Sequence, residues 1–370
     1  MPNEIRMLVT ADWQTEFANL DQCERAAKDV LRICAFKKLT TVAFAGDLKR
    51  AYNPVDVRVT RFWLDFISRL RKRNLEVLLV LGNHDRVGMY ADASNWLPIL
   101  RRAGARVFDR AKANVLPGIS VLPFCSSVEK MRRASRKLAA QQRGSRGVLL
   151  FHGDVHGCLY NQTFQSKAAF RVADFEPAKY LAVIGGHVHL PQWIEGRVGY
   201  CGSPFCTDWG EANQRKCFVV VIGDKIERIR SSQPGWYDES VKGFYPPSNW
   251  KGARVRIAAV CRKGDDYAAA VNRARGDARA KYKGAEISVV LRVKDDQTAI
   301  DAVARLADSD EVKIKRYVER AAKDEMKKQA GRLTAYLNWR LQEVSGSTRQ
   351  DFDVRFLWAE AENFLSFRNV

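Results

Sequence analysis

The sequence predicts an α/β protein in which a layered sheet carries functional residues at the ends of its strands. Short apolar runs rich in Val, Leu and Ile recur through the first half of the chain, and such runs are typical of buried strands. They cover residues 5–9, 42–45, 77–81, 148–151 and 181–184. Residues 21–36 and 57–73 repeat their apolar positions every three or four residues, which indicates helices between the first three strands. This strand, helix, strand order favours a sheet with its functional groups beyond the carboxyl ends of the strands.

The chain is long enough for several structural units. After residue 185 short alternating strands predict a β-rich second half of the first domain, and a stretch rich in Pro and Gly then predicts a linker. Strands at 253–260 and 286–293 and a helix at 298–307 predict a small α+β unit after it. The expected organisation is a catalytic domain at 1–232, a linker at 233–250, a small α+β capping domain at 251–317, a docking helix at 318–345 and a tail at 346–370.

Composition limits the class of protein. The 370 residues include 62 Lys and Arg against 42 Asp and Glu, a formal net charge of +20, which favours a polyanionic partner, nucleic acid before an anionic membrane surface. No apolar run reaches 18 residues and the first ten residues do not resemble a signal peptide, so we expect a soluble, cytoplasmic protein without membrane contact. Eight scattered cysteines without a C-x-x-C pair indicate reduced thiols rather than a zinc ribbon.

Four of the five histidines lie in clusters that follow predicted strands. The clusters are Asp12, Gly46-Asp47, Gly82-Asn83-His84-Asp85, His152-Gly153 and Gly185-Gly186-His187-Val188-His189. Five strand ends thus deliver carboxylate, amide and imidazole groups to one edge of the sheet. Oxygen and imidazole donors without thiolates suit manganese, iron or zinc and argue against a structural zinc site.

In this order the motifs D-x-[HQ], G-D, G-N-H-D, H-G and G-H-x-H resemble those of the calcineurin-like metallophosphoesterases. The resemblance implies a four-layer sandwich, two mixed β-sheets flanked by helices, here with a small α+β capping domain and a C-terminal helix. It also implies two divalent metal ions, manganese first, with magnesium, iron or zinc as alternatives.

The same resemblance assigns roles to residues of this chain. Asp47 would bridge the two metals, which together can stabilise the attacking and leaving oxygens of a phosphoester. The first metal would be held by Asp12, Gln14 and His189, and the second by Asn83, His152 and His187. His84 would donate a hydrogen bond or a proton to the phosphate or leaving oxygen, and Asp85 would fix its tautomer.

Gln14 departs from the family pattern, because most members have histidine two residues after the first aspartate. An amide oxygen is a weaker donor than imidazole. One interpretation is a loosened first metal site that still works, with a higher metal demand or a different preference. The alternative is an impaired or inactive enzyme.

Motifs after the last histidines are similar to those of the SbcD-type nucleases. The chain reads His189-Leu190-Pro191-Gln192, then Tyr200-Cys201-Gly202-Ser203-Pro204, then Trp209-Gly210-Glu211. The resemblance implies a manganese-dependent DNA exonuclease or endonuclease that works with an SbcC-like SMC-type ATPase in DNA repair or recombination, and a homodimer. Residues 359–370 resemble the opening strand of that ATPase, although no P-loop occurs. A nuclease and ATPase fusion and an amphipathic tail strand are both consistent with this tail.

The basic runs favour DNA as the substrate but do not exclude the alternatives. Residues 69–73, 132–137 and 315–328 supply charge that could neutralise DNA phosphates, although each run alone could be a solvated face. The alternatives to a nuclease are a phosphodiesterase or phosphatase for non-DNA substrates, and a DNA-binding scaffold in which the first metal is not bound because of Gln14.

Overall fold

The computed structural model describes residues 4–88, 94–142, 147–161, 164–241, 246–262 and 264–294. One compact unit covers Met1–Ala259 and Tyr267–Leu291, and the architecture below concerns its described residues. The helix predicted at 298–307, the docking helix at 318–345 and the tail at 346–370 lie outside the described residues.

The first sheet has the strand order β12-β11-β1-β2-β3-β4. Its strands are β1 (Arg6–Thr10), β2 (Thr41–Phe44), β3 (Glu76–Val80), β4 (Arg106–Phe108), β11 (Cys217–Ile222) and β12 (Lys225–Arg230). Strands β1 to β4 are parallel, so their carboxyl ends lie at one edge. The chain returns to this sheet late, because β11 pairs antiparallel with β1, with Val221 opposite Met7.

The second sheet has the order β5-β6-β7-β8-β10-β9. Its strands are β5 (Lys112–Leu116), β6 (Ile119–Leu122), β7 (Gly147–His152), β8 (Tyr180–Gly186), β9 (Gln192–Glu195) and β10 (Val198–Tyr200). The four central strands, β6, β7, β8 and β10, are parallel, and the outer two pair antiparallel with their neighbours.

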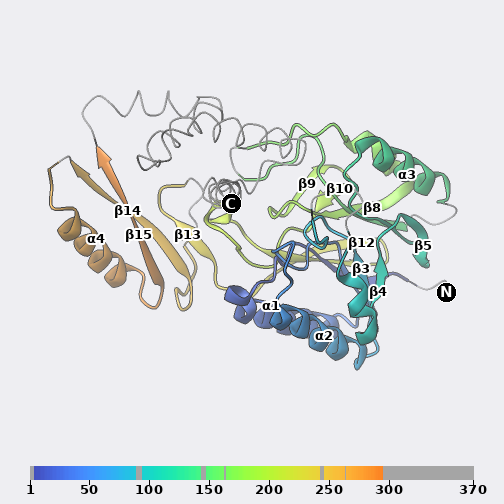
Figure 1. Cartoon of the computed structure of the whole chain (residues 1–370), viewed down its shortest axis with the longest axis horizontal. Helices are drawn as coiled ribbons and strands as arrows, with labels where there is room; N and C mark the ends of the chain where they lie inside the picture. Colours follow the sequence, from blue (N-terminus) through green and yellow to red (C-terminus); the bar gives the residue numbers. More distant parts are fainter. Residues whose placement is uncertain are drawn as a thin grey trace, which may run out of the picture. The chain divides into compact units, whose positions relative to one another are not determined.

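Alternating side chains place the two sheets face to face, with helices outside. In β1, Leu8 packs toward the helices α1 (Leu20–Phe36) and α2 (Val57–Arg71), whereas Met7 and Val9 pack between the sheets. In β7, Leu150 faces the same intersheet core, whereas Leu149 packs toward α3 (Val128–Ala140). Side chains of a strand alternate between its two faces, so β1 and β7 are buried on both faces. Figure 1 shows α1 and α2 side by side, with α3 across the two sheets from them. The predicted four-layer sandwich is confirmed.

Short 3₁₀ helices occupy several connections. They are η1 (Phe17–Asn19), η2 (Leu97–Ala103), η3 (Val172–Phe175), η4 (Pro177–Lys179) and η5 (Trp209–Glu211). Within the described residues no helix is both long enough and apolar enough to cross a membrane.

A small three-stranded sheet follows the sandwich in the chain. Its order is β13 (Trp236–Asp238), β14 (Arg254–Arg262) and β15 (Glu286–Lys294), with helix α4 (Tyr267–Lys281) between the last two strands. Strand β13 lies inside the predicted linker at 233–250 and pairs parallel with β14. That prediction needs correction here, because Tyr237 of β13 packs with Val255 and Tyr282 in a core of its own.

Candidate metal centre

Loops leaving five strands of the two sheets bring the predicted ligands together. Asp12 follows β1, Asp47 follows β2 and Asn83 follows β3, all in the first sheet. From the second sheet, His152 is the last residue of β7 and His187 follows β8 directly. Because the carboxyl ends of parallel strands meet at one edge, both sheets contribute to one site, as expected from the sequence.

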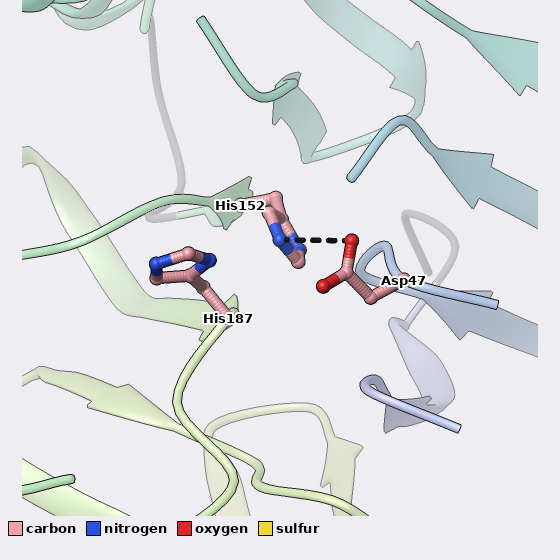
Figure 2. A group of neighbouring side chains, drawn as sticks. All are labelled: Asp47, His152 and His187. Atoms are coloured by element: carbon pink, nitrogen blue, oxygen red, sulfur yellow. Dashed lines mark ion pairs between the residues drawn. The ribbon is translucent and has the colours of Figure 1, made fainter. Parts of the chain in front are cut away.

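The Asp47 carboxylate and two imidazole rings form the centre of this site. Figure 2 shows the ring of His152 facing Asp47, with His187 beside it. The Nε2 atom of His152 lies 3.4 Å from Oδ1 of Asp47, and one ligand atom from each of the three residues lies within 4.8 Å of the others. Asn83 completes the group, because its Oδ1 lies 3.0 Å from Nε2 of His152 and 2.9 Å from Nδ1 of His187.

The protonation state of His152 shows whether these residues fit a bound cation. Its Nδ1 lies 2.7 Å from the carbonyl oxygen of Ala45 and therefore donates a proton to it. Burial lowers the pKa of His152 to about 4, so at neutral pH its Nε2 carries a lone pair. That lone pair faces the oxygens of Asn83 and Asp47, which are acceptors too. Acceptors at such distances need a cation or a proton between them, so these residues fit a metal ion.

Backbone strain is concentrated at the same place. Four non-glycine residues of the site have positive φ angles, 54° at Asp12, 44° at Gln14, 55° at Asp47 and 104° at His187. Such conformations cost about 1–3 kcal/mol each and persist where the surrounding structure enforces them. Gly82 leaves room for the carboxylate, because a Cβ atom there would lie 2.2 Å from Oδ1 of Asp47.

Gln14 lies against the second oxygen of Asp47. Its Nε2 donates to Oδ2 of Asp47 over 2.9 Å, and its Oε1 is buried without a hydrogen-bond partner among the described residues. Unpartnered buried oxygens are rare in proteins and call for an explanation. A cation bound beside Asp47 would provide one, so the amide fits the first metal site predicted for it.

Asp12 is fully buried near the same group. Both of its carboxylate oxygens accept from the backbone N–H of His187, at 2.8 and 3.0 Å. Burial raises the pKa of Asp12 to about 8, a shift that the charge of His189 opposes and the charge of Asp47 reinforces. A carboxylate this poorly solvated is stabilised by a neighbouring cation.

His189 has a partner that the sequence analysis did not assign. Its Nδ1 lies 2.7 Å from Oε1 of Glu211, a buried residue of η5. Burial alone would lower the pKa of His189, but the charge and hydrogen bond of Glu211 raise it to about 9. Glu211 is the last residue of the Trp209-Gly210-Glu211 motif, which was noted as a resemblance without a role for its carboxylate.

A second group of potential ligands comprises His189, Asp208 and Glu211. It does not suit a metal ion, because the ammonium group of Lys216 contacts Oε2 of Glu211 and lies in the same buried network. The Asp208 carboxylate accepts from the backbone N–H of Gly210 instead.

The ring of His84 is held by a backbone carbonyl and an aromatic neighbour. Its Nδ1 lies 2.6 Å from the carbonyl oxygen of Arg50, and its ring stacks on Tyr52 with 4.7 Å between centroids. Asp85 does not make the predicted contact with His84. Instead its buried carboxylate accepts from the backbone N–H groups of three residues and from the indole of Trp96. The three N–H groups belong to Asp47, Leu48 and Gly82, at 2.9, 3.0 and 2.9 Å. The prediction that Asp85 fixes the His84 tautomer is therefore wrong, since the Arg50 carbonyl does so.

Lys49 supplies a buried positive charge next to this loop. Its ammonium group donates to the carbonyl oxygens of Ala51 at 2.6 Å, of Tyr52 and Arg86 at 3.0 Å, and of His84. Burial lowers the pKa of Lys49 to about 8, against the opposing charges of Asp85 and Asp47. The loop that carries Arg50 and the loop that carries His84 are thereby tied together.

The comparison with known families agrees with this geometry. Residues 5–191 match the family described as calcineurin-like phosphoesterase. The chain belongs to this family, whose members use divalent metals.

More distant similarities extend over the same region. The chain is 22% identical over 228 residues to "Putative phosphoesterase 078R" of Invertebrate iridescent virus 3, covering 60% of this chain and 64% of that protein. Among solved structures it resembles a nuclease MPE from Pseudomonas putida, with 16% identity, a TM-score of 0.30 and coverage of 60% and 87%. It also resembles a dimetal phosphatase from Danio rerio, with 12% identity, a TM-score of 0.37 and coverage of 62% and 99%.

Proposed function

We propose that this chain is a DNA nuclease that hydrolyses phosphodiester bonds at a centre of two divalent cations, manganese first. The observation that carries the proposal is the meeting of carboxylate, amide and imidazole groups from five strand ends around Asp47. One oxygen of that carboxylate lies toward Gln14 and the other toward His152. A ligand with different neighbours on its two oxygens is suited to a position between two cations. We propose Asp12, Gln14 and His189 for the first cation and Asn83, His152 and His187 for the second.

When bound, the cations would lower the pKa of water and polarise the phosphoester. The protein's own part is to orient these groups and to provide a proton donor. His84 suits that part, because the Arg50 carbonyl accepts from Nδ1–H and leaves Nε2 as the atom that can meet the phosphate or the leaving oxygen. Asp85 supports the site from beneath by holding the backbone of Asp47 and Gly82.

The net charge of +20 supports DNA as the substrate. The basic runs contribute less than their residue count suggests, because some of their arginines form ion pairs within the domain. These are Arg69 with Glu24 at 3.1 Å, Arg71 with Glu76 at 2.6 Å and Arg132 with Asp174 at 3.1 Å. Within the two runs that the structure describes, 69–73 and 132–137, the exposed basic side chains are Lys72, Arg73, Arg133, Arg136 and Lys137. We propose that these exposed side chains contact the phosphates of the DNA.

An SbcC-like SMC-type ATPase as partner, and a homodimer, are part of the same proposal. They rest on the motif resemblance and on the residues after 317, which lie outside the described part of the chain. The chain spans 64% of the length of the curated relative that it matches.

The direct test is cleavage of labelled linear and hairpin DNA with manganese, with magnesium and with EDTA. We expect manganese-dependent cleavage that His84→Ala abolishes. His156→Ala is the matched control, because His156 is exposed and its ring contacts a backbone carbonyl, that of Ala168 at 3.2 Å, away from the site. This variant should cleave normally.

Other outcomes would replace the nuclease assignment. Hydrolysis of para-nitrophenyl esters without DNA cleavage would favour a phosphatase or phosphodiesterase for other substrates. Tight DNA binding with one cation per chain and no cleavage would favour a scaffold. Unchanged cleavage by His84→Ala would remove His84 from the chemistry.

A further inference from the structure

The turn at Ser203 and the step at Glu211 meet in a buried network around His189. Glu211 and Ser203 are buried, 4% and 0% exposed, and the ring of His189 contacts Oε1 of Glu211 at 2.7 Å. The sequence alone gives neither motif a chemical role, and the network supplies one.

The Glu211 carboxylate is fixed on both oxygens. Its Oε2 accepts from the hydroxyl of Ser203 at 2.9 Å and from the ammonium group of Lys216. Its Oε1, besides the His189 ring, accepts from the backbone N–H of Thr207 at 3.3 Å and from the Thr207 hydroxyl. A carboxylate with so many donors has little freedom to rotate away from the ring.

The same residues also hold the main chain of His189. Its carbonyl oxygen accepts from the Ser203 N–H at 3.2 Å and from Nζ of Lys216 at 3.0 Å. Lys216 is 7% exposed and contacts the Glu211 carboxylate as well, so one ammonium group joins the backbone of His189 to the residue that orients its ring. One group of residues, Glu211, Lys216 and Ser203, therefore fixes both the position and the orientation of the His189 ring.

We propose that Glu211, held by Lys216 and Ser203, is a positioning residue that makes His189 a stronger ligand and so compensates for Gln14 at the same cation. The inference rests on the proposed two-cation centre. A carboxylate that accepts from Nδ1–H leaves Nε2 as the lone-pair atom and raises its basicity, a general device of metal-binding histidines. Gln14 offers a neutral amide oxygen, a weaker donor than imidazole. The negative charge of Glu211, transmitted through the His189 ring, supplies electron density that Gln14 does not.

The test is manganese binding to the full chain, measured by titration calorimetry without any substrate. We expect two cations in the unsubstituted chain. In Glu211→Gln we expect one affinity to fall by about 10- to 100-fold while the other is retained. Adding Gln14→His to Glu211→Gln should restore much of the lost affinity, because imidazole replaces the weak donor. Asp208→Asn is the matched control, since Asp208 is an exposed acid nearby that contacts Gly210, and its affinities should not change.

A second measurement does not depend on how the variants fold. In the zinc-loaded unsubstituted chain, ¹⁵N spectra of the His189 ring should show a proton on Nδ1, and a ring bound to zinc through Nδ1 would overturn the proposal. Equal affinities in Glu211→Gln and the unsubstituted chain would do so as well. Loss of both cations together with a lower unfolding temperature would also overturn it, since Glu211 would then be a packing residue. Fewer than two cations in the unsubstituted chain would refute the two-cation centre itself. Absent DNA cleavage with two cations bound would refute only the nuclease assignment.

Discussion

Replacing Asp85 by asparagine tests whether this residue is a structural support rather than part of the chemistry. In the folded chain its Oδ2 accepts from the N–H groups of Asp47 and Gly82, and its Oδ1 accepts from Leu48 and the Trp96 indole. An asparagine side chain has one acceptor oxygen and one NH₂ donor. Whichever way it turns, two buried N–H groups lose their acceptor and face another donor.

The expected loss of stability follows from these two groups. Each unsatisfied buried donor costs about 1–3 kcal/mol, which gives about 2–6 kcal/mol for the pair. Burial raises the pKa of Asp85, so removing its charge returns part of this cost. We therefore expect the lower half of the range, about 2–4 kcal/mol.

The assay is urea unfolding of the metal-free chain, so that cation binding does not contribute. Asp65→Asn on α2 is the control, because Asp65 is exposed and forms one long ion pair with Arg61 at 3.7 Å; it should change the free energy of unfolding by less than about 0.5 kcal/mol. An Asp85→Asn variant as stable as the unsubstituted chain would refute this reasoning and would return Asp85 to the chemistry.

Three further predictions follow from the same contacts. Gly82→Ala should abolish manganese binding in titration calorimetry while circular dichroism stays native, because its Cβ would lie 2.2 Å from Oδ1 of Asp47; normal binding would contradict the close approach. Lys49→Met should lower the turnover of DNA cleavage by about a hundredfold, because the loop carrying His84 loses its anchor. The Lys49→Met variant should bind the same number of cations as the unsubstituted chain. Equal turnover in the two would show that Lys49 does not anchor the loop that carries His84. Burial raises the pKa of Cys23 to about 12, so only the unfolded chain ionises this thiol near pH 9. Above pH 9 the unsubstituted chain should therefore lose stability relative to Cys23→Ala by up to about 1.4 kcal/mol per pH unit, and parallel pH profiles of the two would contradict it.

The buried parallel strands and their helices could be predicted because their sequences carry strong apolar patterns. Other elements lack that signal. Helix α4 is rich in Ala and Arg and has Gly276 in its interior, and only Ala278 of its side chains is buried. Strand β5 reads Lys112-Ala113-Asn114-Val115-Leu116 and lies at the edge of its sheet. Helix α3 shows in the sequence only as a basic run, because its buried face is narrow.

The grouping of the site residues could also be predicted, because strand ends in an α/β sheet converge. The hydrogen-bond partners of these residues could not be predicted. The acceptor for His84 is the backbone carbonyl of Arg50, and a backbone group leaves no mark in the sequence. Glu211 reaches His189 from 22 positions later in the chain, so only the folded arrangement relates them. Asp85 follows His84 directly, yet its side chain lies beneath the loop, and adjacency in sequence suggested the wrong contact. All eight cysteines are free thiols, as their spacing predicts.

The antiparallel pairing of β11 with β1 has a consequence for how the domain forms during synthesis. Strand β1 can pair with β2 early, but its other edge stays open until the ribosome has produced β11, from the opposite end of the domain. Pairings between segments so far apart in sequence form slowly, and an open apolar edge invites association with other chains. A fragment ending at residue 191, where the family match ends, would contain every proposed cation ligand and still leave this edge bare. Such a fragment should aggregate rather than fold.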